Sequence, residues 1–290
     1  MPMAKANNID IYYETFGDPT KPAFLLIMGA CCQGILYPVE FCQGLADLGY
    51  WVIRYDHRDT GFSTCFDYEK NPYELSDMAK DAIGLLNHLQ IGKAHLVGLS
   101  LGGPIAEYIA VFYPNRVYSI NLIATSAEFR PMNLAFDNLP EEEGFPSRTI
   151  DIYLKWMKKF VDNPPENLDD HIALRVEGWE ILCGFSVPFE REYYQKLQAE
   201  VIQRMQNPVS MINHLKVCKV SEDIFRWLPS QVKVPTLIFH GTEDPIFPSD
   251  HGVYLANKIK NSKYFLIEGM GHVPHRIFFN FILDKIKCHY

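Results

Sequence analysis

The chain has 290 residues, 48% of them hydrophobic, and a formal net charge of −8 at pH 7 from 35 acidic and 27 basic residues. This length suits one large domain, or one domain with a sizeable insertion, and is sufficient for a full core. Because no Lys/Arg-rich run offsets the acidic balance, the composition argues against nucleic acid and membrane surfaces as partners and favours a small molecule.

The N-terminal segment lacks the apolar core of a signal peptide. The most apolar stretch, residues 95–113, is broken by glycine, proline and Glu107, which argues against a membrane span. The seven cysteines are an odd number and include no C-x-x-C pair, so reduced thiols are expected. Together these features predict a cytoplasmic protein.

Strand-like and helix-like runs alternate along the first half of the chain. Apolar runs predict strands at Ala23–Met28, Trp51–Tyr55, Ala94–Leu99 and Val117–Ala124. Helices are predicted near Pro38–Leu48, near Leu75–Leu89 and from Leu101 onward. Such alternation is typical of an α/β protein with a parallel central sheet.

After Thr125 the alternation stops, and the chain becomes helical in pattern, punctuated by proline and rich in aromatic residues. One helix is predicted near Ile150–Val161, with Ser147 as its candidate cap, and another near Phe189–Met205, where apolar residues recur every four positions. We therefore predict an inserted helical cap rather than a second independent domain. The predicted division is a core of residues 1–125 and 231–290 with a cap of residues 126–230.

The segment Gly98-Leu-Ser100-Leu-Gly102 follows a predicted strand and precedes a predicted helix. A side chain projects from the edge of a parallel sheet only if the strand turns sharply into the next helix, and small flanking residues relieve the crowding of that turn. The pattern indicates a nucleophile elbow with Ser100 as the catalytic nucleophile. By itself, it could also be a glycine- and serine-rich turn without chemistry.

A serine nucleophile needs a base, and the base needs an acid that fixes its tautomer. Two further strands are predicted at Val234–His240 and Tyr264–Glu268, and each is followed by such a residue: Asp244 and His272 respectively. Both would lie at the sheet edge that carries the serine, because the carboxyl ends of parallel strands meet there. Glu243 is the adjacent alternative acid. The non-catalytic alternatives are a turn-stabilising aspartate and a surface histidine.

An oxyanion needs two backbone donors. The amide of Leu101, directly after the nucleophile, is one candidate, and the amide of Ala30, in the loop after the first predicted strand, is the other. Cys31 and Cys32 should line or underlie the pocket; either is an alternative nucleophile, but neither lies on an elbow.

The pair His272 and His275 lacks the i, i+4 spacing of helical zinc motifs and is separated by Pro274, so no metal is expected. No cofactor is expected either, since triad chemistry uses only side chains and water.

The combination of Gly98–Gly102 with Gly241-Thr-Glu-Asp244 and Gly269-Met-Gly-His272 resembles the α/β-hydrolase superfamily over nearly the whole chain. The run from Arg54 to Ser63 is similar to the D-x-R-G-x-G-x-S loop of that superfamily, with Asp59 in place of a glycine. This version of the loop, together with Met28-Gly29 in place of the common His-Gly of the oxyanion loop, makes the sequence most similar to carboxylesterases of the aclacinomycin methylesterase type.

The resemblance implies an α/β-hydrolase fold, a mostly parallel sheet with a helical cap, and hydrolysis of a carboxylic ester, with methyl esters among the candidates. Lactone, thioester or carbon–carbon bond hydrolysis on the same triad, and a non-catalytic small-molecule receptor, are the alternatives. The predicted cap holds three of the four tryptophans and several other aromatic residues, which favours an apolar or aromatic substrate. These residues are Phe145, Trp156, Trp179, Phe185, Phe189, Tyr193, Tyr194 and Trp227.

Overall fold

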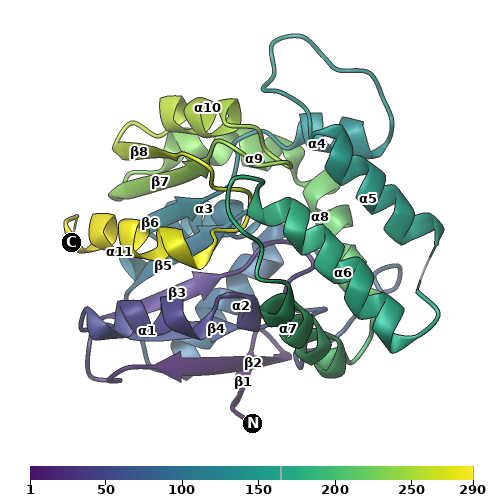
Figure 1. Cartoon of the computed structure of the whole chain (residues 1–290). Coiled ribbons are helices and arrows are strands. Elements are labelled where there is room, and N and C mark those ends of the chain that lie inside the picture. The colour runs from purple at the N-terminus through teal and green to yellow at the C-terminus, as the bar shows by residue number, and fades with distance from the viewer. Residues whose placement is uncertain (164, 290) are drawn as a thin grey trace.

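A computed structural model describes residues 1–163 and 165–289. Within these residues, eight strands form one sheet in the order β1-β2-β4-β3-β5-β6-β7-β8 (Figure 1). The pairs β1–β2 and β2–β4 are antiparallel, and every other neighbouring pair is parallel. The predicted α/β fold with a mostly parallel sheet is confirmed. The strands are β1 (Met3–Ala6), β2 (Ile9–Phe16), β3 (Ala23–Ile27), β4 (Trp51–Tyr55), β5 (Ala94–Leu99), β6 (Val117–Ile123), β7 (Thr236–Gly241) and β8 (Ser262–Ile267).

Helices cover both faces of this sheet. Helices α1 and α11 pack against each other on one face, and α2 and α3 lie together on the other. The helices of the sheet region are α1 (Val39–Asp47), α2 (Leu75–His88), α3 (Gly102–Phe112), α10 (Asp250–Lys258) and α11 (Phe279–Lys287). Between β6 and β7 the chain forms α4 (Arg130–Phe136), α5 (Asp151–Asp162), α6 (Leu168–Cys183), α7 (Arg191–Arg204), α8 (Asn213–Val220) and α9 (Glu222–Trp227).

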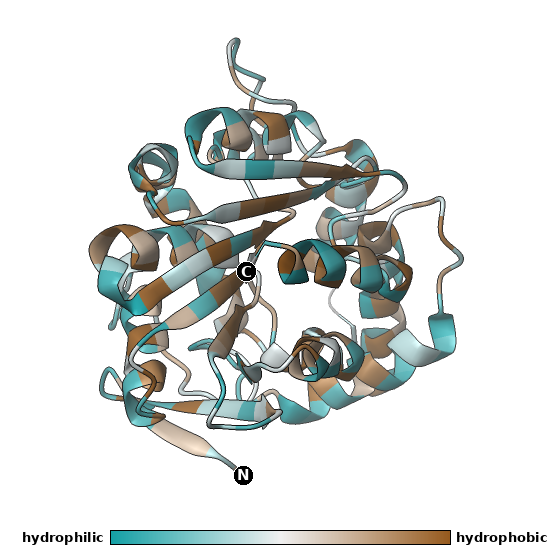
Figure 2. Cartoon of the chain, turned by 90° about the vertical axis from the view of Figure 1, so that its left-hand side faces the viewer, coloured by the Kyte–Doolittle hydropathy of each residue, from teal (hydrophilic) through white to brown (hydrophobic). Residues whose placement is uncertain are grey.

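The core follows from the two-residue period of the strands. In β3, Leu25 and Ile27 join the cluster under α2 and α3, whereas Phe24 and Leu26 join the cluster under α1 and α11. Because side chains of a strand alternate between faces, a strand that is buried on both faces must be apolar throughout. Figure 2 shows this as brown central strands with more polar residues on the outer sides of the helices.

The predicted strands coincide with observed strands to within about two residues at each end. The antiparallel strands β1 and β2 were not predicted, because the N-terminal sequence alternates polar and apolar residues only weakly. The prediction that Ser147 caps a helix is wrong: α5 begins at Asp151, and the amide and hydroxyl of Ser147 both donate to the carboxylate of Asp250.

The predicted apolar stripe of α7 is also displaced. The stripe was expected to include Tyr193, yet that side chain is 36% exposed, while the neighbouring Tyr194 is buried. Val201, which the predicted stripe included, is buried, and the other buried positions of α7 are Tyr194, Gln198 and Arg204. The two polar members are buried because each has a partner: Gln198 accepts from Arg175, and Arg204 pairs with Asp56.

Helices α4–α9 all lie between β6 and β7, within the stretch predicted to form the cap. Figure 1 shows α5, α6 and α7 gathered beside the sheet. Residue 164 of the predicted cap and residue 290 of the predicted core lie outside the described residues. Among the described residues, no helix is long and apolar enough to span a bilayer.

Candidate active site

Ser100 lies in a tight turn between β5, which ends at Leu99, and α3, which begins at Gly102. Its φ of +52° is in the left-handed region that a side-chain-bearing residue rarely adopts, and its amide donates to the carbonyl of Ile123 at 3.0 Å. The flanking glycines are required by close contacts: a Cβ at Gly98 would lie 2.3 Å from the carbonyl oxygen of Gly102. A Cβ at Gly102 would lie 2.1 Å from the carbonyl oxygen of Ile27.

The predicted acid and base are in direct contact. His272 Nδ1 lies 2.9 Å and 3.0 Å from the two carboxylate oxygens of Asp244 and donates its proton to them. Both side chains are buried, and Asp244 Oδ1 also accepts from the amides of Ile246 and Phe247 at 2.9 and 3.0 Å. This contact fixes the tautomer in which His272 Nε2 is free to accept a proton.

Burial acts to raise the pKa of Asp244, but the neighbouring imidazoles of His272 and His240 and the Phe247 amide outweigh it. The pKa of Asp244 therefore lies below its ordinary value, and the group is a carboxylate at neutral pH.

The alternative acid, Glu243, points elsewhere. Its carboxylate accepts from the amides of Phe185 and Ser186, in the loop between α6 and α7, and from the Ser186 hydroxyl. Glu243 therefore ties the helical segment to the sheet edge, and the contact with His272 belongs to Asp244.

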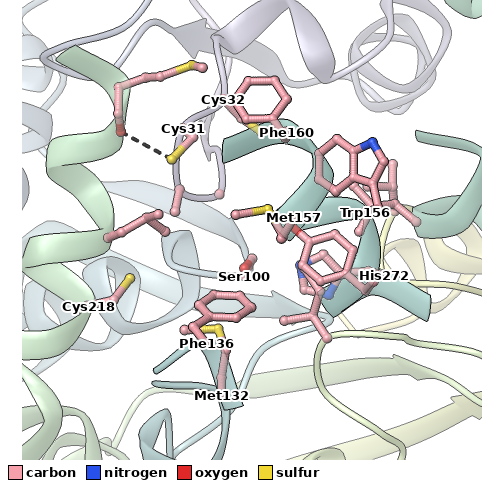
Figure 3. A pocket seen from close by; sticks show the side chains of 18 of the residues that line it. Cys31, Cys32, Ser100, Met132, Phe136, Trp156, Met157, Phe160, Cys218 and His272 are labelled. Carbon is pink, nitrogen blue, oxygen red and sulfur yellow. Dashed lines mark hydrogen bonds between the residues drawn. The ribbon is translucent and has the colours of Figure 1, made fainter. Parts of the chain in front are cut away.

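Ser100 and His272 line the same cavity, which has a volume of about 190 Å³. Figure 3 shows Ser100 at its centre, with Phe136 and Met132 on one side and Met157 and Trp156 on the other. In the described structure, Ser100 and His272 share no hydrogen bond. Hydrogen bonds of this kind are often long in unliganded sites and shorten when substrate binds.

The amides of Ala30 and Leu101 are the candidate oxyanion donors. Neither donates a hydrogen bond within residues 1–163 and 165–289. Gly29, next to Ala30, lies so close to Ser100 that an added Cβ would be 3.1 Å from Ser100 Cβ. The loop that carries Ala30 therefore lies directly beside Ser100, and both amides can donate to a ligand.

Sequence reasoning did not single out His214, which holds this loop in place. The amide of Cys31 donates to His214 Nδ1 at 2.9 Å, and His214 Nε2 donates to the carbonyl of Arg58 at 2.8 Å. Burial lowers the pKa of His214 to about 4, so the ring is neutral and can accept at Nδ1. Cys31 itself has a φ of +61°. No local pattern around His214 signals this role, because the contact joins residues 183 positions apart.

The two thiols of the oxyanion loop line the cavity, as predicted. Burial raises the pKa of Cys32 to about 11 and also raises that of Cys31. The Cys31 thiol donates to the carbonyl of Met211 at 3.1 Å, the dashed line in Figure 3. Both groups are therefore thiols at neutral pH rather than the thiolates that act as nucleophiles. All seven cysteines are free.

His275 does not join His272 in a ligand set: its Nε2 lies 3.2 Å from a carboxylate oxygen of Glu190. Among the described residues, no group of three or more His, Cys, Asp or Glu side chains could hold a metal ion.

The remaining cavity lining is apolar, aromatic and rich in sulfur. Two of the tryptophans singled out from the sequence, Trp156 and Trp179, are part of it, whereas Trp227 is 46% exposed and makes a tilted ring contact with Phe112. Other lining aromatics were not singled out from the sequence, since their spacing does not distinguish a pocket wall from a helix core. These are Phe129, Phe136, Tyr153 and Phe160.

The loop after β4 is held in place by buried polar contacts. Asp56 accepts from the amides of Gly34 and Phe62 and pairs with Arg204, while Arg58 pairs with Asp81 at 2.6 Å. These groups are buried and bonded to the scaffold, so their contacts are structural.

Comparison with known proteins places these features in a wider group. A family model described as alpha/beta hydrolase fold matches residues 22–276. A rhodomycin D methylesterase of Streptomyces peucetius is 31% identical over 282 residues, covering 93% of this chain and 91% of that protein. A 3-oxoadipate enol-lactonase of Acinetobacter baylyi is 23% identical over 272 residues, covering 91% and 86%. Among solved structures, an enol-lactonase from Burkholderia xenovorans matches with a TM-score of 0.75 at 19% identity and covers 98% of each chain.

Proposed function

The chain belongs to the α/β-hydrolase family, whose model spans residues 22–276, and from this premise we propose that it is a serine esterase. Its proposed substrate is the carboxylic ester of an apolar or aromatic small molecule. The observation that carries the proposal is the convergence of a strained, cavity-lining Ser100 and a His272–Asp244 pair on one apolar cavity.

In the proposed mechanism, His272 Nε2 takes the hydroxyl proton as Ser100 Oγ attacks the ester carbonyl carbon. The oxygen of the tetrahedral intermediate accepts from the amides of Ala30 and Leu101. As the ester bond breaks, the leaving alcohol takes the proton from His272, and the acyl group remains on Ser100. Water then gives a proton to His272 and attacks the acyl carbon. As the bond from that carbon to Ser100 Oγ breaks, His272 returns the proton to Oγ, which releases the acid and restores the serine. Asp244 holds the imidazole throughout and stabilises its charged form.

The proposed substrate preference rests on the cavity wall. Helices α5 and α6 contribute Trp156, Met157 and Trp179, so we propose that residues 126–230 act as a cap that selects substrates by apolar and aromatic contact. The 31% identical relative is a methylesterase, which makes a methyl ester the first substrate class to test.

Lactone hydrolysis is the second candidate, because the Acinetobacter baylyi relative and the Burkholderia xenovorans structure are both enol-lactonases. A lactone is a cyclic ester and is opened by the same steps, with the leaving alcohol still attached to the acid.

The test is turnover of purified protein on matched methyl esters, p-nitrophenyl esters and lactones that differ in apolar size. We expect hydrolysis that increases with aromatic size, and loss of nearly all of it in Ser100→Ala. Ser230→Ala is the matched control, because this exposed hydroxyl contacts only neighbours in the chain: it donates to the Trp227 carbonyl and accepts from the Gln231 side chain. Turnover that survives in Ser100→Ala, or a folded parent without activity on any ester or lactone, would contradict the proposal.

A further inference from the structure

A buried arginine without a carboxylate faces the cavity. Arg175, on α6, is 8% exposed and is one of the residues that line the space around Ser100. Its Nε donates to Gln198 Oε1 at 2.8 Å, and this is the one hydrogen bond that its guanidinium makes within the described residues. Its two terminal amino groups have no hydrogen-bond partner among the described residues, and the Arg175 side chain is part of the cavity lining.

The other buried arginines of the described structure are all neutralised. Arg54 pairs with Glu14 at 2.7 Å, Arg58 with Asp81 at 2.6 Å and Arg204 with Asp56 at 2.9 Å. Pairing is expected, because a buried charge without a counter-ion costs several kcal/mol. Arg175 departs from this pattern, and it does so in the cavity that contains Ser100 and His272.

The cavity itself offers no counter-ion. Its lining contains no aspartate or glutamate. Besides Arg175, its polar side chains are Ser100, His272, the thiols, Tyr153 and the indoles of Trp156 and Trp179. The Tyr153 hydroxyl makes no hydrogen bond in the described part of the chain. In this apolar lining, the guanidinium of Arg175 and the hydroxyl of Tyr153 can therefore donate hydrogen bonds to oxygen atoms of a ligand.

We infer that Arg175 is a specificity-determining residue that binds a carboxylate on the substrate, separate from the ester that Ser100 attacks. The inference rests on the proposed function and names its substrate class: esters that also carry a free acid. The planar guanidinium presents parallel N–H donors that match the two oxygens of a carboxylate. Ser100 comes from the sheet edge and Arg175 from α6, and both line the same cavity, so one molecule can contact both.

The direct test is binding to Ser100→Ala, which does not depend on turnover. Isothermal titration calorimetry would compare benzoate, 3-phenylpropanoate and 5-phenylpentanoate with the matching carboxamides. We expect at least one acid to bind about tenfold or more tightly than its amide, the gain of a charge-assisted bidentate contact. That preference should vanish in Ser100→Ala with Arg175→Met and persist with Arg191→Met, which removes an exposed arginine paired with Glu180. Should Arg175→Met fail to fold, Arg175→Lys keeps the charge without the planar fork, and a reduced preference is expected.

A kinetic comparison separates this inference from the proposed function. The parent enzyme would be assayed on monomethyl esters of dicarboxylic acids and on the corresponding ester amides. If neutral esters are hydrolysed but no chain length shows a preference for the acid, the role of Arg175 is refuted while the esterase stands. If no ester is hydrolysed but the calorimetric preference for acids depends on Arg175, the carboxylate site is supported and the proposed esterase activity is refuted. Equal affinity for acids and amides, binding of neither, or a preference retained in Arg175→Met would overturn the inference.

Discussion

Glu107→Gln should stabilise the protein at neutral and alkaline pH. Glu107 lies on α3 and is fully buried, and neither of its carboxyl oxygens has a hydrogen-bond partner among the described residues. Burial raises its pKa from 4.5 to about 8, so the folded protein keeps this carboxyl protonated at pH 7, whereas the unfolded chain releases the proton.

The sign and size follow from proton linkage. Between about pH 4.5 and pH 8 the folded state binds one more proton at this site than the unfolded state, so stability falls as the pH rises. Each pH unit in this window costs about 1.4 kcal/mol, which accumulates to about 3 kcal/mol at pH 7. The glutamine variant has no proton to release, and this cost disappears.

The assay is urea denaturation of the parent and Glu107→Gln at pH 5, 6, 7 and 8. The free energy difference between the two proteins should be small at pH 5 and grow in favour of the variant by a few kcal/mol up to pH 8. Glu200→Gln, an exposed glutamate on α7, is the control and should follow the parent. Parallel pH dependence in Glu107→Gln and the parent would refute the reasoning.

Three further changes probe the site. Asp244→Asn should lower kcat by about 10⁴ through loss of the His272 tautomer, whereas Glu243→Gln should stay within about tenfold of the parent; ester kinetics showing the reverse order would move the acid role to Glu243. His214→Leu should lower kcat by about tenfold or more with little change in KM, because the oxyanion loop loses its anchor; an effect on KM alone would argue against this role. Gly102→Ala should cost about 3 kcal/mol or more, since its Cβ would overlap the Ile27 carbonyl, and an unchanged melting temperature would contradict the observed close contact.

Much of the sheet could be predicted because its signals are local. Apolar runs of strand length and the glycine frame of Ser100 depend on neighbouring residues, and β4 and β5 were predicted with the bounds observed. Ser100, Asp244 and His272 each follow a predicted strand, so the contact between Asp244 and His272 could be predicted from the sequence.

The rest depends on contacts between distant residues. His214 and Arg175 look like ordinary helix residues in the sequence. His214 is distinguished by its hydrogen bond from the amide of Cys31, and Arg175 by a guanidinium that contacts Gln198 and no carboxylate among the described residues. The inward face of α7 was predicted only in part, for the same reason. A period of four assumes that apolar residues point inward, as Val201 does, but Gln198 and Arg204 are buried because residues on other segments form hydrogen bonds with them.

The measurement that tests the central claim most directly is the site of covalent modification. The protein would be inactivated with a p-nitrophenyl phosphonate, and the adduct located by peptide mass spectrometry, with thermal melting of Ser100→Ala as the folding control. We predict stoichiometric phosphonylation of Ser100 and none in the folded alanine variant, which should retain only the roughly 10³-fold enhancement over water that binding and oxyanion donors supply. An adduct on Cys31, Cys32 or another serine, with Ser100→Ala still hydrolysing ester at the parent rate, would contradict the account.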